Sequence, residues 1–403
     1  MDADLVVTRL SRLYTLDPSS EGLGERSDVS VAFAGGKLLY VGDPANAPEA
    51  AVTFDGRGCI GLPGLVDPHT HAVWAGSRSS EFARRLAGES YTAILESGGG
   101  IRSTVRATRE ASTEVLTASA RARLEGMLEH GVTTVEVKSG YGLEPAQEAR
   151  LLSVARSASD RVRVVTTFLG AHAVPEELRG DRRAYVRQVI DEQLPRCAPL
   201  ADCIDVYCDR GAFTLDEAVE ILTAGRARGL GVRAHAEQVD HTGIAEAAAA
   251  LGATSVDHLE RIDDRGIDAM ATNGTVAGLL PAAQVYLKDV SPPVARLREA
   301  GIPMAVGTDL NPGTSPVRDL WIAATLATLV QGLTIAEAVL GITRNAGKAL
   351  GRPDLGWLGE GSVADLAVFR PPPGEPPAVE SLVQFLGDHR AALVVRDGRV
   401  VHR

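Results

Sequence analysis

The sequence predicts an α/β protein in which a (β/α)8 barrel of the TIM type carries a small β-sandwich domain formed by the N- and C-terminal segments. From about residue 62 to residue 350, apolar strand-like runs alternate with amphipathic helical patterns, which is typical of a parallel sheet covered by helices. Both ends of the chain are instead rich in short strands. No GxGxxG turn follows a predicted strand, which argues against an open dinucleotide-binding sheet.

The two ends of the chain share one character, that of short β-rich segments punctuated by Gly and Pro. The N-terminal segments are DLVVTRL, SVAFAGGKLLYVG and AVTFDGRG, and the C-terminal ones are SVADLAVFR and AALVVRDGRVVHR. We therefore expect residues 1–61 and 351–403 to form one small β-sandwich domain, and residues 62–350 to form the barrel.

The middle of the chain contains eight strand-like runs. In order they are GLVDPHTH, GVTTVEVKSGYG, RVRVVTTFLGAH, CIDVYCD, GVRAHAEQV, TSVDHL, GTVAGLLP and PMAVGTDL. Helical patterns such as EVLTASARARLEGMLEH and LDEAVEILTAGRARG lie between them. Eight such units favour a closed barrel, a fold that commonly uses about 250 residues.

Composition excludes several classes of function. The net charge of -11 argues against a nucleic-acid partner, because neutralising phosphates requires a basic face. We expect no signal peptide and no membrane span, since no apolar run reaches the roughly 20 residues that a bilayer requires. The four cysteines match no zinc pair and indicate reduced thiols in a cytoplasmic protein. A homodimer is the expected assembly, because it is the commonest one.

Histidines recur where the predicted strands end, which is where barrels of this kind place their active sites. His69 and His71 close the first strand, and side chains two residues apart on a strand share a face. The other polar residues at strand ends are His172, His235, His258 and Asp309. His130, His241, His389 and His402 do not follow strands, and we interpret them as surface or loop residues. The pattern predicts a metal site on one rim of the barrel.

Imidazole nitrogens with one carboxylate suit zinc or iron better than calcium or magnesium, which prefer oxygen ligands. Such a cation lowers the pKa of bound water from about 16 toward about 7. Some barrels of this type hold two metals bridged by a modified lysine on the fourth strand. The corresponding run, CIDVYCDRGAF, contains no lysine, and Lys138 lies on the second strand. We therefore expect one divalent or trivalent metal ion per subunit, zinc or iron.

The segments LPGLVDPHTH and GTDLNPG resemble the amidohydrolase superfamily. A closer resemblance is to the imidazolonepropionase family, and it is carried by AGSRSSEFARRLAGESYTAILESGGGIRSTVRATR, TTVEVKSGYG, TFLGAHAVP, HAEQ, DHLE and TDLNPGTSP. The resemblance runs from about residue 62 to residue 350. It implies hydrolysis of the imidazolone ring of 4-imidazolone-5-propanoate to N-formimidoyl-L-glutamate in histidine degradation.

The resemblance also implies site residues. The metal ligands would be His69, His71, His235 and Asp309. The substrate contacts would be Arg78, Tyr141, His172, Gln238, Asn311, Gly313 and Thr314. A propionate tail needs a cationic fork, and Arg78 binds a carboxylate through two parallel hydrogen bonds where Lys cannot. Tyr91 and Tyr141 would add hydroxyl donors to the same carboxylate.

For the chemistry we expect Asp309 to carry a proton from the attacking water to the departing ring nitrogen, with His258 as an alternative carrier or an oxyanion donor. Gln238 cannot act as a base and would instead hydrogen-bond the ring nitrogens. Two alternatives remain open at this point. The chain is another amidohydrolase that acts on a nitrogen heterocycle, or it is a non-catalytic barrel, in which metal ligands are typically lost.

Overall fold

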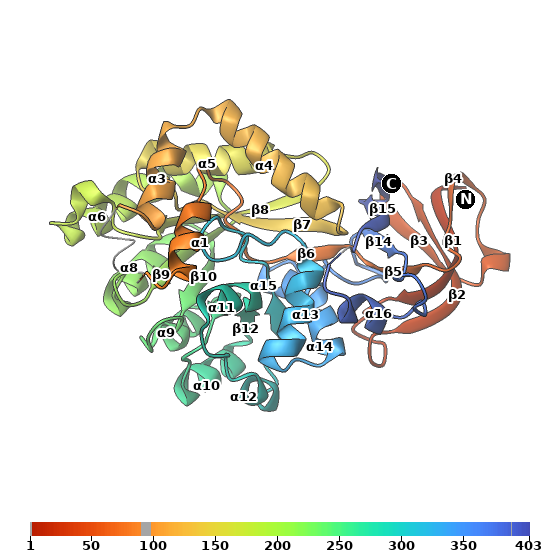
Figure 1. Ribbon diagram of the computed structural model, residues 1–403. Coiled ribbons are helices and arrows are strands. Elements are labelled where there is room, and N and C mark those ends of the chain that lie inside the picture. Colours follow the sequence, from red (N-terminus) through yellow and green to blue (C-terminus); the bar gives the residue numbers. More distant parts are fainter. Residues whose placement is uncertain (1, 90–97, 388) are drawn as a thin grey trace.

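The protein was analysed as a computed structural model that describes residues 2–89, 98–387 and 389–403. It has two units, a helix-covered barrel and a smaller sheet that contains both termini (Figure 1). This arrangement confirms the predicted fold class.

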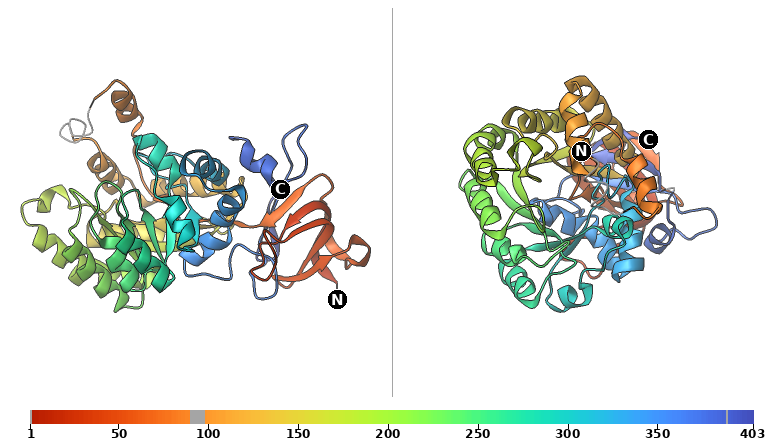
Figure 2. Two further views of the ribbon diagram at one scale, coloured as in Figure 1. Left: turned by 90° about the horizontal axis from the view of Figure 1, so that it is seen from below. Right: turned by 60° about the vertical axis from the view of Figure 1, so that its left-hand side comes forward.

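The barrel consists of eight parallel strands, which hydrogen-bond to one another in the order of the sequence. Thr70 forms a parallel bridge with Leu310, and this bridge joins the first strand region to the last. The helices form a ring around these strands, as the right-hand view of Figure 2 shows. Each of the eight strand-like runs in the sequence contains one of these strands: β6 (Leu65–Asp67), β7 (Val132–Lys138), β8 (Arg163–Ala171), β9 (Cys203–Cys208), β10 (Gly231–Ala236), β11 (Ser255–His258), β12 (Val276–Leu279) and β13 (Met304–Val306).

Local signals explain where the covering helices begin. Thr214 accepts a hydrogen bond from the backbone of Glu217, whose side chain accepts one in return, and this capping box starts α8. Thr334 and Glu337 start α14 in the same way. The helices of the barrel are α1 (Ser79–Leu86), α3 (Ile101–Glu110), α4 (Thr113–Leu128), α5 (Pro145–Ser157), α6 (Arg182–Gln188), α7 (Leu194–Cys197), α8 (Leu215–Arg226), α9 (Ile244–Ala250), α10 (Asp264–Asn273), α11 (Pro281–Leu287), α12 (Val294–Glu299), α13 (Leu320–Gln331), α14 (Ile335–Gly341) and α15 (Arg344–Ala349).

The smaller unit is one hydrogen-bonded sheet of eight strands from both ends of the chain. They are β1 (Ala3–Tyr14), β2 (Glu25–Ala34), β3 (Lys37–Gly42), β4 (Ala50–Asp55), β5 (Ile60–Pro63), β14 (Leu366–Phe369), β15 (Ala391–Arg396) and β16 (Arg399–His402). Alternate residues such as Val31 and Phe33, or Leu366 and Val368, point into one core cluster. The domain limits stay a prediction, and the expected limit after residue 61 falls inside β5.

The C-terminal helix α16 (Val379–Gln384) ties the smaller unit to the barrel, because it packs against α13. His389 belongs to this junction. It is 4% exposed, with Nδ1 3.2 Å from Asp319 Oδ2 and Nε2 2.8 Å from the carbonyl oxygen of Leu382. His389 lies in the loop between α16 and β15, as one half of the surface-or-loop interpretation held, but it is not a surface residue, because these two acceptors satisfy a buried imidazole.

Two sequence-based expectations concern the whole chain. Every helix in the described ranges is too short or too polar to pass through a bilayer. All four cysteines are described, buried and free of disulfide bonds, as expected of reduced thiols.

Candidate metal centre and active site

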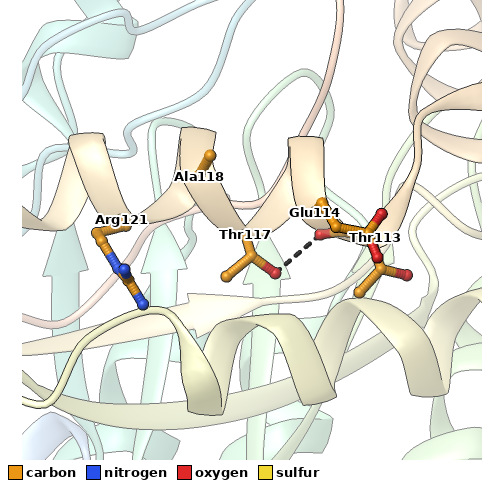
Figure 3. Close-up of a pocket in the computed structure, with 5 residues that line it drawn as sticks. All are labelled: Thr113, Glu114, Thr117, Ala118 and Arg121. Carbon is orange, nitrogen blue, oxygen red and sulfur yellow. Dashed lines mark hydrogen bonds between the residues drawn. The ribbon is translucent and has the colours of Figure 1, made fainter.

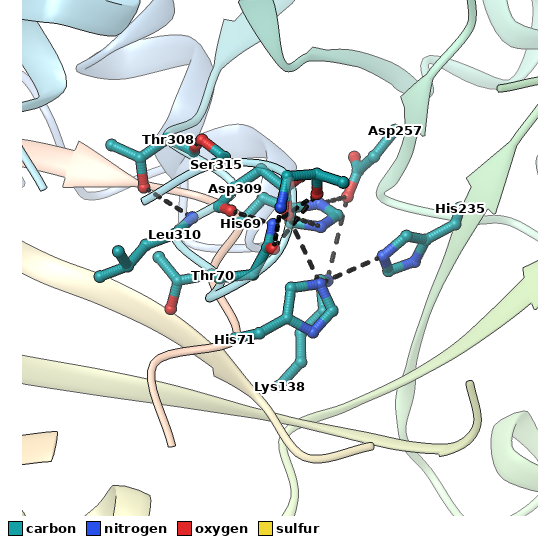
Figure 4. A network of polar contacts seen from close by, with 12 residues as sticks. His69, Thr70, His71, Lys138, His235, Asp257, Thr308, Asp309, Leu310 and Ser315 are labelled. Atoms are coloured by element: carbon teal, nitrogen blue, oxygen red, sulfur yellow. Dashed lines mark hydrogen bonds and ion pairs between the residues drawn. The ribbon is translucent and has the colours of Figure 1, made fainter. Parts of the chain in front are cut away.

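His69 and His71 lie just past the end of β6, where the barrel closes. The backbone N–H of His71 donates to Leu310 at 2.9 Å, and that of Asp309 donates to the carbonyl of His69 at 3.0 Å. These bonds hold both segments extended beyond their strands, so the two imidazoles share the inner face (Figure 4). Both side chains are buried, as the prediction of a site at the rim requires.

Three histidines form the centre of the site. Candidate ligand atoms of His69, His71 and His235 all lie within 4.8 Å of one another. Nε2 of His71 is 3.4 Å from Nε2 of His235. Oδ1 of Asp309 is 3.6 Å from Nε2 of His69 and 3.5 Å from Nε2 of His71. The structure thus brings together all four residues that the sequence predicted as ligands.

The donor set fits a metal ion. Nδ1 of His69 lies 2.7 Å from Asp257 Oδ2, and Nδ1 of His235 lies 3.1 Å from Asp205 Oδ1. A carboxylate behind a histidine fixes the tautomer in which Nδ1 carries the proton, which leaves the Nε2 lone pair free to bind a metal. Within the described part of the chain, Nε2 of His69 is buried without a hydrogen-bond partner. A cation between these nitrogens would satisfy it.

His172 and His258 flank the three central histidines. The ring of His172 stacks on that of His71 at 5.0 Å, and the ring of His258 lies 5.5 Å from that of His235. Burial, together with the nearby His235, lowers the pKa of each of them to about 3. Both imidazoles are therefore neutral near pH 7 and can act as a donor or an acceptor.

Tyr141 is presented by a rigid loop that follows β7. The buried carboxylate of Glu148 accepts from the backbone N–H groups of Gly140, Gly142 and Leu143 at 2.7–2.9 Å. Gly140 has φ +101°, and a Cβ there would lie 2.9 Å from Nδ1 of His172, so only glycine fits. Burial raises the pKa of Tyr141, which keeps its hydroxyl protonated as a donor. The turn that presents Tyr141 therefore requires glycine at position 140 of the KSGYG segment.

Arg78 lies at the start of α1, in the loop above the barrel. Its Nε donates to Glu81 Oε2 at 2.5 Å, and its side chain is 13% exposed. Glu81 also accepts from the backbone N–H of Gly100 at 3.2 Å and from Ser103 at 3.0 Å. A Cβ on Gly313 would lie 2.8 Å from Nη1 of Arg78, so these two predicted substrate contacts are neighbours. Because Glu81 engages Nε, the Nη end of the guanidinium is directed toward Gly313.

Asn311 organises the loop that the sequence placed at the substrate. Its Oδ1 accepts from the backbone N–H groups of Gly313 and Thr314, both at 2.8 Å, and its Nδ2 donates to the carbonyl of Asp309 at 2.7 Å. The amide therefore holds the loop next to the metal ligand. The backbone N–H of Gln238 donates to Asp209 at 3.1 Å. Tyr91 lies outside the described residues.

Sequence reasoning missed the carboxylates that support the ligands. Asp205 and Asp257 lie inside strands that otherwise appear apolar, and that was the available signal, because a buried carboxylate needs a partner. Glu260, two residues after His258, was missed as well. Its carboxylate is buried, Oε1 lies 4.0 Å from Nδ1 of His258, and burial raises its pKa to about 8. Glu260 is therefore protonated at neutral pH.

A hollow on the outer face of the barrel has a different character (Figure 3). It lies over α4 and is lined by Thr113, Glu114, Thr117, Ala118 and Arg121. The lining has no histidine or cysteine, and its one internal bond runs from the Thr117 hydroxyl to the Thr113 carbonyl at 2.8 Å. This hollow therefore lacks the imidazole ligands that gather at the histidine cluster.

Comparison with known proteins identifies the family of this chain. The profile of the amidohydrolase family matches residues 82–402. The imidazolonepropionase of Caulobacter vibrioides is 47% identical over 367 residues, which cover 89% of this chain and 92% of that protein. The imidazolonepropionase of Polaromonas sp. is 45% identical over 383 residues, which cover 93% of this chain and 89% of that protein.

Solved structures show the same fold at low identity. An atrazine chlorohydrolase from Arthrobacter aurescens TC1, complexed with zinc, superposes with a TM-score of 0.71 at 20% identity and covers 98% of this chain and 94% of its own. An adenosine deaminase from Xanthomonas campestris with bound zinc superposes with a TM-score of 0.73 at 18% identity and covers 99% and 93%. The family match and the extensive identity to curated relatives lead to one assignment. The chain belongs to the amidohydrolase family and, within it, to the imidazolonepropionases.

Proposed function

We propose that this chain hydrolyses 4-imidazolone-5-propanoate to N-formimidoyl-L-glutamate, a step of histidine degradation. The oxygen of water bonds to the ring carbonyl carbon, and the bond from that carbon to the ring nitrogen breaks. One proton of the water goes to the departing nitrogen, and the carbonyl carbon becomes a carboxylate. The reaction is therefore hydrolysis of a cyclic amide.

The observation that carries this proposal is the position of Tyr141, which links the histidine cluster to Arg78. Tyr141 is buried, its ring lies 5.9 Å from that of His71, and the charges of both Asp309 and Arg78 act on its hydroxyl. A metal-binding cluster alone would suit many heterocycles. An arginine fork on the same rim favours a substrate with a carboxylate tail, because Arg forms paired charge-assisted bonds to carboxylates.

In this proposal the rim residues bind the propionate. The Nη end of Arg78 meets the carboxylate, and the hydroxyl of Tyr141 donates to it. Glu81 fixes Nε of Arg78, so the guanidinium needs little reorganisation when the substrate arrives. His172, whose Nδ1 lies 3.0 Å from the carbonyl of Gly140, presents Nε2 toward the site. The loop that Asn311 holds, with Gly313 and Thr314, covers the tail.

We further propose one metal ion, zinc or iron, held by His69, His71, His235 and Asp309. Nitrogen ligands with one carboxylate suit either metal. When bound, the ion would lower the pKa of a water molecule and polarise the ring carbonyl. The zinc in the two structural relatives supports this choice.

The chain's own residues would move the proton. Burial raises the pKa of Asp309 well above its usual range, and a bound cation would oppose this by favouring the carboxylate, the form that accepts a proton. In the proposal, Asp309 accepts the proton of the attacking water and delivers it to the ring nitrogen. Neutral His258 would donate a hydrogen bond to the developing oxyanion. Gln238 contributes an amide donor to the ring.

The test is the loss of imidazolone absorbance when the purified protein is added. We expect rapid loss that a chelator abolishes and that added zinc or iron restores. Product analysis should give N-formimidoyl-L-glutamate in equal amount. If a metal-loaded sample leaves the imidazolone intact, the proposed substrate is wrong and other cyclic amides become the candidates.

We also propose that the protein is a cytoplasmic homodimer, as the sequence led us to expect. Sedimentation at two protein concentrations measures the assembly, and fractionation of cells measures the location. A monomer at both concentrations would contradict the first proposal.

A further inference from the structure

Lys138 is buried beneath the histidine cluster (Figure 4). Its Nζ is 2.8 Å from Glu136 Oε1, 2.8 Å from Asp205 Oδ2 and 3.9 Å from Asp257 Oδ2. All four side chains are at most 1% exposed. Figure 4 shows the lysine rising toward the histidines from β7. A buried ammonium is costly unless several acceptors surround it, and here three carboxylates do so.

Each of these carboxylates supports one part of the proposed metal site. Asp205 accepts from the backbone N–H of His235 and lies 3.1 Å from its Nδ1. Asp257 lies 2.7 Å from Nδ1 of His69. Glu136 accepts at 3.1 Å from the backbone N–H of Thr70, the residue between His69 and His71. One ammonium therefore contacts the carboxylates that hold the rings of His69 and His235, and the carboxylate that holds the backbone between His69 and His71.

The three carboxylates differ in the cations that lie beside them. Asp257 has a second cation, since Nη2 of Arg233 lies 2.8 Å from its Oδ2. Among the described residues, Lys138 is the cation that forms ion pairs with both Glu136 and Asp205, and the charge of Arg233 also acts on Glu136 from farther away. Burial opposes the charge of Lys138, but Asp205 and Glu136 raise its pKa above the usual value, so the ammonium is charged at neutral pH.

We propose that Lys138 is a positioning residue, whose ammonium draws Glu136 and Asp205 together and thereby holds His69, His71 and His235 in the geometry that binds the metal. This inference rests on the metal site of the proposed function. Without the lysine, two buried carboxylates would face each other with no cation between them, and repulsion would move them away from the groups they orient. The histidines would then lose their fixed directions.

The first experiment compares Lys138→Met with the native protein. Methionine keeps most of the side-chain volume and removes the charge. Zinc affinity is measured by competition with a chromogenic chelator, and folding of the metal-free proteins by circular dichroism. We expect Lys138→Met to bind zinc about 10- to 100-fold more weakly, the range typical for loss of groups that orient metal ligands. Lys37→Met, which removes an exposed lysine from β3 in the smaller sheet, is the matched control and should leave the affinity unchanged.

Kinetics separate a positioning role from a general packing role. Turnover by Lys138→Met should fall at limiting zinc and rise again as zinc is added, while KM for the substrate stays within about threefold at saturating zinc. A packing defect would not respond to zinc in this way. Native affinity in a folded Lys138→Met protein, or lost turnover that excess zinc fails to restore, would overturn the proposal.

A second pair of variants tests the positioning role of Lys138 if Lys138→Met does not fold. Glu136→Gln keeps an oxygen acceptor for Thr70 but removes the charge at position 136. When Lys138 is then also replaced, Asp205 no longer faces a second buried carboxylate at that position. We expect Glu136→Gln/Lys138→Met to bind zinc more weakly than Glu136→Gln, but more tightly than Lys138→Met where that protein is folded. Equal affinities of Glu136→Gln with and without Lys138 would overturn the proposal. Failure of the native protein to bind zinc would instead contradict the proposed metal site.

Discussion

The floor and the rim of this active site are built in different ways. The floor consists of Glu136, Lys138, Asp205, Arg233 and Asp257, which lie on four strands of the barrel (β7, β9, β10 and β11) and are at most 1% exposed. The rim consists of Arg78, Glu81 and the loop 311–315, which lie on connecting segments and include partly exposed side chains. The floor is fixed by strand register, whereas the rim is fixed by a few side-chain bonds.

This difference indicates how such a site divides its tasks. Groups that must hold an ion to within fractions of an ångström lie on the rigid scaffold, and groups that recognise a substrate lie on loops. Removal of one partner from a buried ion pair commonly costs about 3–5 kcal/mol, because the other charge stays buried. Changes on the floor should therefore affect metal binding and turnover, and changes on the rim should affect substrate affinity.

The strongest test of this division is at the proposed metal site, which the floor supports. Asp309→Ala should lower turnover by about 10³-fold or more at saturating zinc and substrate, and His258→Ala by about 10²-fold, in keeping with the loss of a proton carrier or an oxyanion donor. Steady-state rates, with zinc content measured on the same samples, check both values. Turnover within threefold of the native rate in either metal-replete variant would show that its assigned role is wrong.

A rim variant should show the opposite pattern. Arg78→Met should raise KM about 10- to 100-fold with turnover changed only a few-fold, because a charge-assisted hydrogen bond contributes about 1.5–3 kcal/mol. Arg78→Lys should fall between the two proteins, since lysine keeps the charge but loses the paired geometry. An imidazolone without the propionate tail is the control substrate, and the native and variant enzymes should handle it equally. A large fall in turnover with unchanged KM would contradict the assignment of substrate affinity to the rim.

The smallest expected effect concerns Glu260, which lies beside His258. Burial raises its pKa from 4.5 to about 8 in the folded chain, so folding favours the protonated form. Its contribution is fully present below about pH 4.5 and is lost as the pH rises through about 8. Glu260→Gln removes this dependence. The unfolding temperature of the variant, relative to that of the native protein, should therefore rise between about pH 5 and about pH 8.5.

Thermal unfolding of the zinc-loaded proteins at both pH values measures the effect of Glu260. The exposed Glu21 provides a control through Glu21→Gln, which should leave the pH dependence as it is in the native protein. Parallel stability curves for Glu260→Gln and the native protein would show that Glu260 is ionised in the folded chain.

Much of the fold could be predicted because its signals are local. Eight apolar runs separated by amphipathic helices indicated the barrel, and each run contains a strand of the observed sheet. The HTH segment and the strand-end His235 and Asp309 indicated a metal site, because parallel strands end on one rim. The smaller sheet was predictable from its β-rich ends, but the place of β5 as a strand between β1 and β14 was not.

By itself, the sequence predicted the barrel and the strand-end histidines with one aspartate, since these follow from periodicity and from the chemistry of single residues, and the resemblance to the imidazolonepropionase family added the expectation that Arg78 binds a carboxylate. Only the tertiary structure decided that Lys138 lies between carboxylates from β7 and β9, that Glu81 fixes Arg78, and that His389 is buried. The physical reason is that these contacts depend on which side chains different strands and loops direct into one space. Such an arrangement is set by register and packing over the whole molecule, and no local pattern contains it.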